Sequence, residues 1–76
     1  MNKYRRQKLW RIVTKLEDLK AELEDILDEE RDAFDALPDS IQGSSRGDEA
    51  SEKIGQLEDI ADLIGDVIDG IEEVTG

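Results

Sequence analysis

Five carboxylates in the second half of the chain have a spacing that could support chemistry. Steps of three or four residues separate them, so they share one face of a helix. They are Asp59, Asp62, Asp66, Asp69 and Glu73. A carboxylate-bridged pair of metal ions would also need inward-facing Glu and His ligands, and the chain contains no His. Because these carboxylates lie opposite an apolar stripe, a solvated helix face is the simplest interpretation. An acidic surface that mimics nucleic acid is the alternative.

A second group of charged residues lies near the N-terminus, where basic residues accompany Tyr4 and Trp10. The basic residues are Lys3, Arg5, Arg6, Lys8 and Arg11. Such a cluster can bind nucleic acid or an anionic membrane. The rest of the chain is strongly acidic and would repel both. We therefore expect these residues to pair with acidic residues of the same chain, and we expect no direct nucleic-acid or membrane partner.

Motifs typical of enzymes are missing from the sequence. It contains no glycine-rich phosphate loop, no nucleophile elbow and no Ser–His or Cys–His arrangement. It also contains neither Cys nor His, which removes thiolate and imidazole metal ligands. We therefore expect a non-catalytic protein with no catalytic, cofactor-binding or metal-binding residues and no cofactor.

The length of the chain limits how stable it can be alone. Its 76 residues form at most one small domain, and so short a chain gains little from its core without disulfides, metals or oligomerisation. Oligomerisation is the aid that this composition leaves. No apolar run approaches the roughly 20 residues that a membrane span needs. No apolar segment follows the basic N-terminus as in a signal peptide, so we expect a cytoplasmic protein.

The first half of the chain has the heptad pattern of a long helix. The heptad a positions hold Leu9, Leu16, Leu23, Glu30 and Leu37, and the d positions hold Ile12, Leu19, Ile26 and Ala33. This spacing places an apolar stripe on one helix face. Val13, Leu27 and Phe34 at e positions widen that stripe. We predict a helix over about 4–36.

A connector over about 37–45 separates this helix from a second one over about 46–74. Pro38 disfavours helical geometry at Leu37, the next residues predict one helical turn that ends at Gly43, and Ser44 or Ser45 is the expected N-cap of the second helix. The second helix repeats the heptad pattern. Its a positions hold Ala50, Leu57, Ile64 and Ile71, its d positions Ile60, Val67 and Val74, and its e positions Ile54, Ala61 and Ile68.

The charge distribution predicts an antiparallel hairpin. Residues 1–20 carry a net charge of +5, whereas residues 21–76 carry −16. A short connector between long helices returns the chain on itself, so the basic segment 3–20 would face the acidic segment 58–73. The opposite charges would then favour antiparallel over parallel pairing. The expected fold is all-α, a coiled-coil-like hairpin that forms the single domain 1–76.

The apolar stripes are wider than one partner helix can cover, because each includes a, d and e positions. Leu63, at a g position, adds further apolar surface. This surplus predicts a homodimer that forms a four-helix bundle. A monomer whose e positions are covered by charged side-chain stems is the alternative. The expected packing and oligomer core is Leu9, Ile12, Leu16, Leu19, Leu23, Ile26, Phe34, Leu57, Ile60, Ile64, Val67 and Ile71.

Glu30 is the one acidic residue at an a position of the first helix. It could accept a hydrogen bond from the connector, set the packing register, or lie exposed near the end of the bundle. In each case we expect a structural role.

The run DEERDAFDALPDSIQGSSRGDE, from Asp28 to Glu49, resembles a pattern that recurs in small acidic proteins of bacteriophages and prophages. The matching residues are Ala33, Phe34, Leu37, Pro38, Ser40, Gln42, Ser44 or Ser45, Arg46 and Gly47. Three glycines in the second helix depart from that pattern, where such proteins favour Ala and Glu. The resemblance implies a phage-type protein in a bacterial host, and it implies no general function.

Two functional hypotheses follow. The first is a self-associating interaction module that binds an unidentified host or phage protein. The second is an acidic inhibitor of a nucleic-acid-handling or defence enzyme, which would use the carboxylate face. Besides the five carboxylates, Trp10 and Arg46 are candidate partner-binding residues. Arg46 belongs to the connector, for which two interpretations exist. A structural turn is the favoured one, and a recognition tip formed by Arg46, Gln42 and Asp39 is the alternative.

Overall fold

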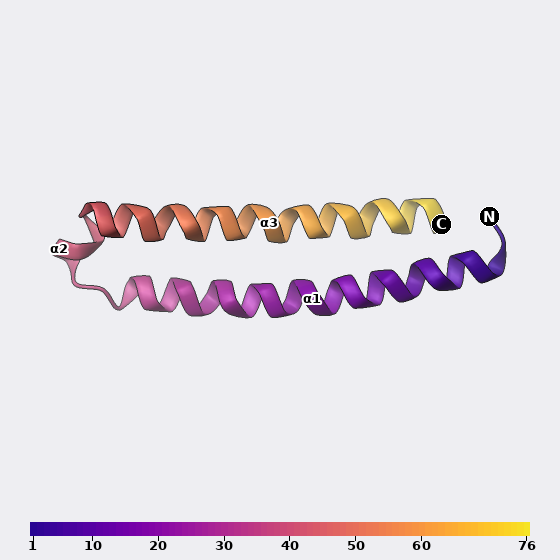
Figure 1. Ribbon diagram of the computed structural model, residues 1–76, viewed down its shortest axis with the longest axis horizontal. Helices are drawn as coiled ribbons and strands as arrows, with labels where there is room; N and C mark the ends of the chain where they lie inside the picture. The colour runs from indigo at the N-terminus through magenta and orange to yellow at the C-terminus, as the bar shows by residue number, and fades with distance from the viewer.

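The computed structural model describes all 76 residues and contains only helices. They are α1 (Lys3–Asp35), α2 (Asp39–Gln42) and α3 (Ser45–Thr75). The two long helices lie side by side and antiparallel, α2 lies at one end, and both termini lie at the other (Figure 1). We refer to these as the closed end and the open end. The hairpin measures 58 × 15 × 12 Å. The predicted all-helical hairpin is confirmed, and each long helix differs from its predicted bounds by one residue at each end.

Local capping determines where α1 begins and ends. The Asn2 side chain accepts a hydrogen bond from the backbone N–H of Arg5 (2.8 Å), which satisfies one of the free donors of the first turn. At the other end, Gln42 of α2 folds back, and its amide nitrogen donates to the carbonyl oxygens of Phe34 (3.1 Å) and Leu37 (3.0 Å). Carbonyls at the end of a helix lack the usual intrahelical donor, and the Phe34 carbonyl also accepts from the Leu37 N–H (3.1 Å). Gln42 is therefore half-buried and structural.

The connector is a compact turn that places α2 against the start of α3. Ser44 is the N-cap of α3, and its hydroxyl accepts a hydrogen bond from the Gly47 N–H (3.5 Å). Gly47 is buried beneath the end of α2. A Cβ atom at this position would collide with the backbone carbonyl oxygens of Ile41 and Gln42. The close approach of α2 to α3 therefore requires glycine at position 47.

The contact between α1 and α3 is centred on heptad positions a and e. The buried apolar side chains, Val13, Leu27, Ala61 and Ile68, all occupy e positions. Seven of the predicted core residues are half-buried beside them: Leu9, Leu16, Leu23, Phe34, Leu57, Ile64 and Ile71. The other five, which occupy d positions, are exposed: Ile12, Leu19, Ile26, Ile60 and Val67. The sequence pattern had suggested that the e residues are the apolar surface left over after the two helices pack. That interpretation is wrong, because in this hairpin the e residues are buried and the d residues remain exposed.

Two small residues of α3 lie in this contact. Ala61 is buried in it, and one turn later the stem of Lys20 lies beside Gly65. A Cβ at Gly65 would lie 3.6 Å from Lys20 Cε, an ordinary contact. The e residues of both helices thus face the partner helix, and the d residues are exposed beside it.

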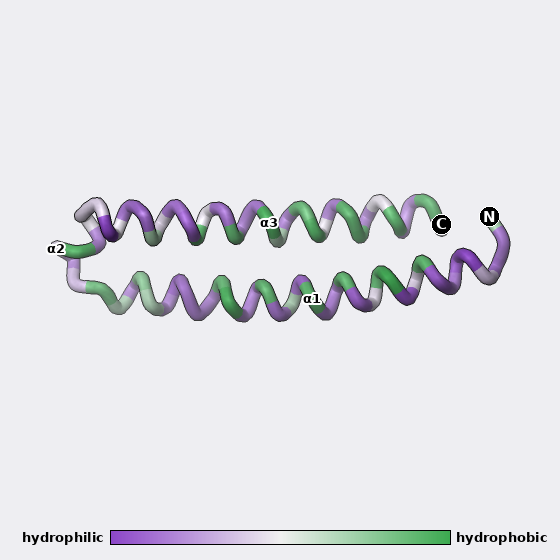
Figure 2. Tube along the Cα trace, in the orientation of Figure 1, coloured by the Kyte–Doolittle hydropathy of each residue, from purple (hydrophilic) through white to green (hydrophobic).

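The hairpin has little core of its own. Only 6 of its 76 residues are buried, and no side chain is fully enclosed. Its accessible surface is 5773 Å², whereas a compact monomer of 8.6 kDa exposes roughly 4,700 Å². Hydrophobic residues recur along the full length of both long helices (Figure 2), but one partner helix covers only part of them.

Candidate protein-interaction faces

An apolar face built from the d positions of both long helices has no partner within the hairpin. It consists of Ile12, Leu19 and Ile26 of α1 and Ile60, Val67 and Val74 of α3, and these side chains are between 45% and 63% exposed. Leu63, beside this stripe on α3, is also exposed. Surface hydrophobic residues are normal when they are scattered, but a contiguous patch marks an interaction site.

A shallow groove of about 440 Å³ shows that the two stripes belong to one face. Ile26 of α1 and Ile60 of α3 line it together with Leu57. Residues seven apart return to nearly the same side of a helix, so the remaining d residues extend this face toward the open end. Glu30 and Lys53 line the same groove and limit the apolar face at its closed-end side.

Glu30 has no structural partner in the connector. Its side chain is exposed, and it accepts no hydrogen bond from Ser44, Ser45 or Arg46. Of the three roles that the sequence leaves open for Glu30, exposure near the end of the bundle agrees with its position.

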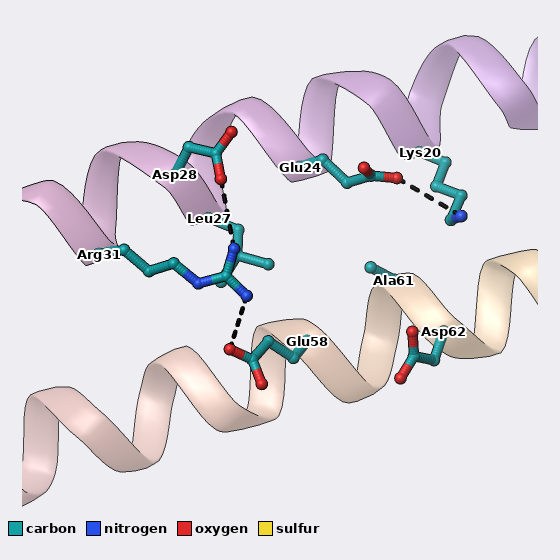
Figure 3. A pocket seen from close by; sticks show the side chains of 8 residues that line it. All are labelled: Lys20, Glu24, Leu27, Asp28, Arg31, Glu58, Ala61 and Asp62. Carbon is teal, nitrogen blue, oxygen red and sulfur yellow. Dashed lines mark hydrogen bonds and ion pairs between the residues drawn. The ribbon is translucent and has the colours of Figure 1, made fainter.

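The other broad side of the hairpin is a charged face, shown in Figure 3. It consists of Lys20, Glu24, Asp28, Arg31, Glu58 and Asp62, which surround a hollow of about 220 Å³ above Leu27 and Ala61. Arg31 joins the helices by donating to Glu58 (2.7 Å) and also pairs with Asp28 on its own helix (3.3 Å). The hydrogen bond to Glu58 is the main cause of the raised pKa of Arg31. This face is therefore polar and already paired in part.

The charge pairing predicted at the open end does not form as ion pairs. The only ion pair between α1 and α3 is Arg31–Glu58, which lies toward the closed end. Lys20 pairs with Glu24 of its own helix. The other six basic residues of the first segment have no carboxylate within 4.0 Å. They are Lys3, Arg5, Arg6, Lys8, Arg11 and Lys15.

Helical geometry explains the missing ion pairs. Most carboxylates opposite the basic segment occupy heptad positions c and f of α3, on the side turned from the helix contact, although Asp62 borders the hollow beside Lys20. Glu72, at a b position, is also exposed and forms no ion pair. All five members of the predicted carboxylate face, Asp59, Asp62, Asp66, Asp69 and Glu73, are exposed and form no ion pair. The summed charge of a segment had indicated complementarity, but the side chains that carry it do not meet.

Trp10 and Arg46 lie apart from the apolar face. Trp10 is about half exposed at a b position, on the side of α1 that continues into the charged face. Arg46 is exposed in the first turn of α3 and forms no ion pair. The structure does not bring these two residues together with each other or with the carboxylates of α3.

No protein-family model matches the chain, and neither a curated protein nor a solved structure is significantly similar to it. Function must therefore be argued from the surfaces themselves. No group of three or more Asp or Glu residues is arranged to hold a metal ion. No helix is both long and apolar enough to cross a membrane.

Sequence reasoning identified the d residues as core but did not place them on a separate face. Both stripes consist of similar apolar residues, so the sequence contains no clear signal that separates them. Each long helix then has one stripe that contacts its neighbour and one that does not. The unpaired basic residues of the open end were also missed, because the angular positions of the charges were not compared.

Proposed function

We propose that this chain is a non-catalytic helical interaction module whose apolar face packs against a second copy to form a four-helix bundle. The observation that carries the proposal is that Ile12, Leu19, Ile26, Ile60, Val67 and Val74 form one exposed face. The hairpin leaves these side chains in water, and a second identical face would remove them from it. Burial of each such side chain is worth roughly 1.5–3 kcal/mol when complete.

The side of the hairpin that carries this face is large enough for a stable interface. It is 58 Å long and 15 Å wide, roughly 900 Å², and a standard interface buries about 800 Å² on each partner. The apolar residues occupy roughly 21 Å of that length, and charged residues surround them. The surface in excess of a compact monomer, about 1,100 Å², has a similar magnitude. The dimer would present charged outer surfaces and the closed-end turn to a further protein of a phage or its bacterial host.

Thermal unfolding at several protein concentrations tests this proposal. The midpoint of a dimer rises with concentration because association stabilises the folded chains. We expect this rise for the wild type and its loss for Leu19→Glu, which places a charge in the apolar face. Ala21→Glu adds the same charge at an exposed position away from that face, so it should preserve the rise. A wild-type midpoint that is independent of concentration would contradict the proposal.

The exposed carboxylates of α3 support a second candidate function, that of an acidic inhibitor of a nucleic-acid-handling enzyme. They are not neutralised by the basic open end, so their charge remains available to a basic groove. This candidate predicts binding that weakens steeply with salt and competes with DNA. Asp62→Asn, Asp66→Asn and Asp69→Asn combined should abolish such binding. Unchanged binding by the triple variant would eliminate the carboxylate face as its cause.

A further inference from the structure

Two copies of the hairpin can join their apolar faces in two symmetric ways. In one arrangement the closed ends lie together, and α1 of each copy packs on α3 of the other. In the second arrangement the closed end of each copy lies over the open end of the other, so that α1 packs on α1 and α3 packs on α3. Both arrangements have two-fold symmetry and bury the same apolar residues. Apolar burial alone therefore cannot decide between them.

The distribution of charge along the hairpin differs strongly between its halves. Lys20 lies beside Gly65, so these two residues mark one level across the hairpin, close to the middle of α1. The open half, residues 1–20 and 65–76, has seven basic and six acidic residues and a net charge of +1. The closed half, residues 21–64, has three basic and fifteen acidic residues and a net charge of −12.

This polarity favours the arrangement with closed end over open end. Placing the closed ends together would bring two closed halves, each with a net charge of −12, against one another in the dimer. The opposite arrangement places each −12 half over the +1 half of the other copy. The unpaired basic side chains of the open end would then face the excess carboxylates, which separates like charges and brings unlike charges together.

The residues beside the apolar stripe of α1 have the pattern that this arrangement needs. Lys8 and Lys15 flank the stripe in the open half, and Glu22 and Glu29 flank it in the closed half; all four are exposed. They are spaced symmetrically about the bond between Asp18 and Leu19. When α1 packs antiparallel on its own copy, Lys15 therefore lies opposite Glu22 and Lys8 opposite Glu29, twice in each dimer.

The apolar residues of α1 are centred within half a residue of this point, on Leu19 itself. Ile12 and Ile26 lie seven residues on either side of Leu19, and in α3 Val74 and Ile60 lie seven residues on either side of Val67. Leu19 and Val67 lie at nearly the same level, because Lys20 lies beside Gly65. One two-fold axis can therefore pass through both helix pairs. On α3 the flanking residues are Leu63 and Gly70, which carry no charge.

We infer that the apolar face binds a second copy with the closed end of each hairpin over the open end of the other, held in this orientation by Lys8 and Lys15 opposite Glu22 and Glu29. The inference rests on the proposed self-association and specifies its geometry. It also assigns a function to the basic open end, whose side chains the hairpin itself leaves without acidic partners.

A distance between the two closed ends tests the orientation. The chain contains no Cys, so Ser40→Cys, at an exposed site in α2, introduces a single position for a spin label. Double electron–electron resonance on the labelled dimer should give a separation that approaches the 58 Å length of the hairpin. A separation within about 20 Å, the width of two packed layers of helices, would overturn the inference and leave the proposed dimer standing. A monomer in the same sample would overturn both.

Charge exchange tests the residues that set the orientation. One variant carries Lys8→Glu and Lys15→Glu, and the other carries Glu22→Lys and Glu29→Lys. Each alone should dimerise at least about tenfold more weakly than the wild type, because four attractive pairs become repulsive. The mixture should form a heterodimer about as tight as the wild-type dimer. Circular dichroism controls for folding of each variant. Folded variants that gain nothing from mixing would contradict the inference.

Discussion

At the scale of single residues, the closed end depends on side chains that are small or that donate to the backbone. Gly47 lets the carbonyls of α2 approach α3, Ser44 caps α3, and Gln42 donates to carbonyls at the end of α1 and just beyond it. Their contacts meet the requirements of a tight turn between two long helices.

Gly47→Ala should lower the free energy of unfolding by about 1–3 kcal/mol, because the added methyl group meets backbone atoms that cannot rotate away. Gly43→Ala is the matched control. Its Cβ would lie 3.6 Å from the Asp39 carbonyl oxygen, an ordinary contact, and Gly43 has a negative φ of −82°. We expect it to change stability by less than about 0.5 kcal/mol. Equal effects of the two substitutions in urea unfolding would contradict this account of the turn.

Trp10 provides a second prediction at this scale, because it lies on the side of α1 away from the apolar face. Its fluorescence maximum should stay constant as protein concentration increases from the monomeric to the dimeric range. A tryptophan at position 67, introduced as Val67→Trp in a Trp10→Phe background, should shift to shorter wavelength over that range. A blue shift of Trp10 itself would indicate that association uses the charged face.

At the scale of the helices, two stripes on each helix have different partners. The e residues pack inside the hairpin and the d residues form the apolar face. The sequence predicted both helices to within one residue at each end because heptads, Pro38 and the caps are local signals. It could not choose between d and e from apolar character alone, because both stripes consist of similar residues. The choice is visible only in the packed pair of helices, where the e residues are buried and the d residues are exposed.

Adjacent residues on α1 test this division. Leu27 is 4% exposed inside the hairpin, whereas Ile26 is half exposed on the apolar face. Leu27→Ala should lower the free energy of unfolding by about 2–5 kcal/mol through lost packing, and it should lower the thermal midpoint at every protein concentration. Ile26→Ala should act by weakening the dimer, so its effect on the midpoint should shrink on dilution. An effect of Ile26→Ala that is the same at all concentrations would place Ile26 in the packing of the hairpin itself.

The open end shows a different limit of sequence reasoning. Charge sums along the chain correctly describe α1 as basic at its start and α3 as acidic throughout. These sums give no information about the direction in which each charged side chain points from the helix axis. Lys8 and Lys15 project beside the apolar face, whereas Asp66 and Glu73 lie at c positions turned away from α1, so the expected ion pairs do not form. Assigning heptad positions to the charges, and not only to the apolar residues, would have revealed this.

At the scale of the whole molecule, the hairpin is long, thin and incomplete as a packed unit. Six buried residues cannot supply the core of a stable domain of this length. One broad face is apolar and unpartnered, the other is charged, and the charge changes from +1 to −12 between the open and closed halves. A second copy that lies over the apolar face, with its closed end over the open end of the first, would enlarge the core, cover the apolar face and place unlike charges together.

Sedimentation equilibrium of the wild-type chain at micromolar concentration is the most direct test of this account. The chain has a mass of 8.6 kDa, so the proposed dimer predicts a species of twice that mass. This species should dissociate on dilution, and it should be absent from Leu19→Glu at the same concentration. A single species of 8.6 kDa across the concentration range would contradict the claim that the apolar face joins two copies.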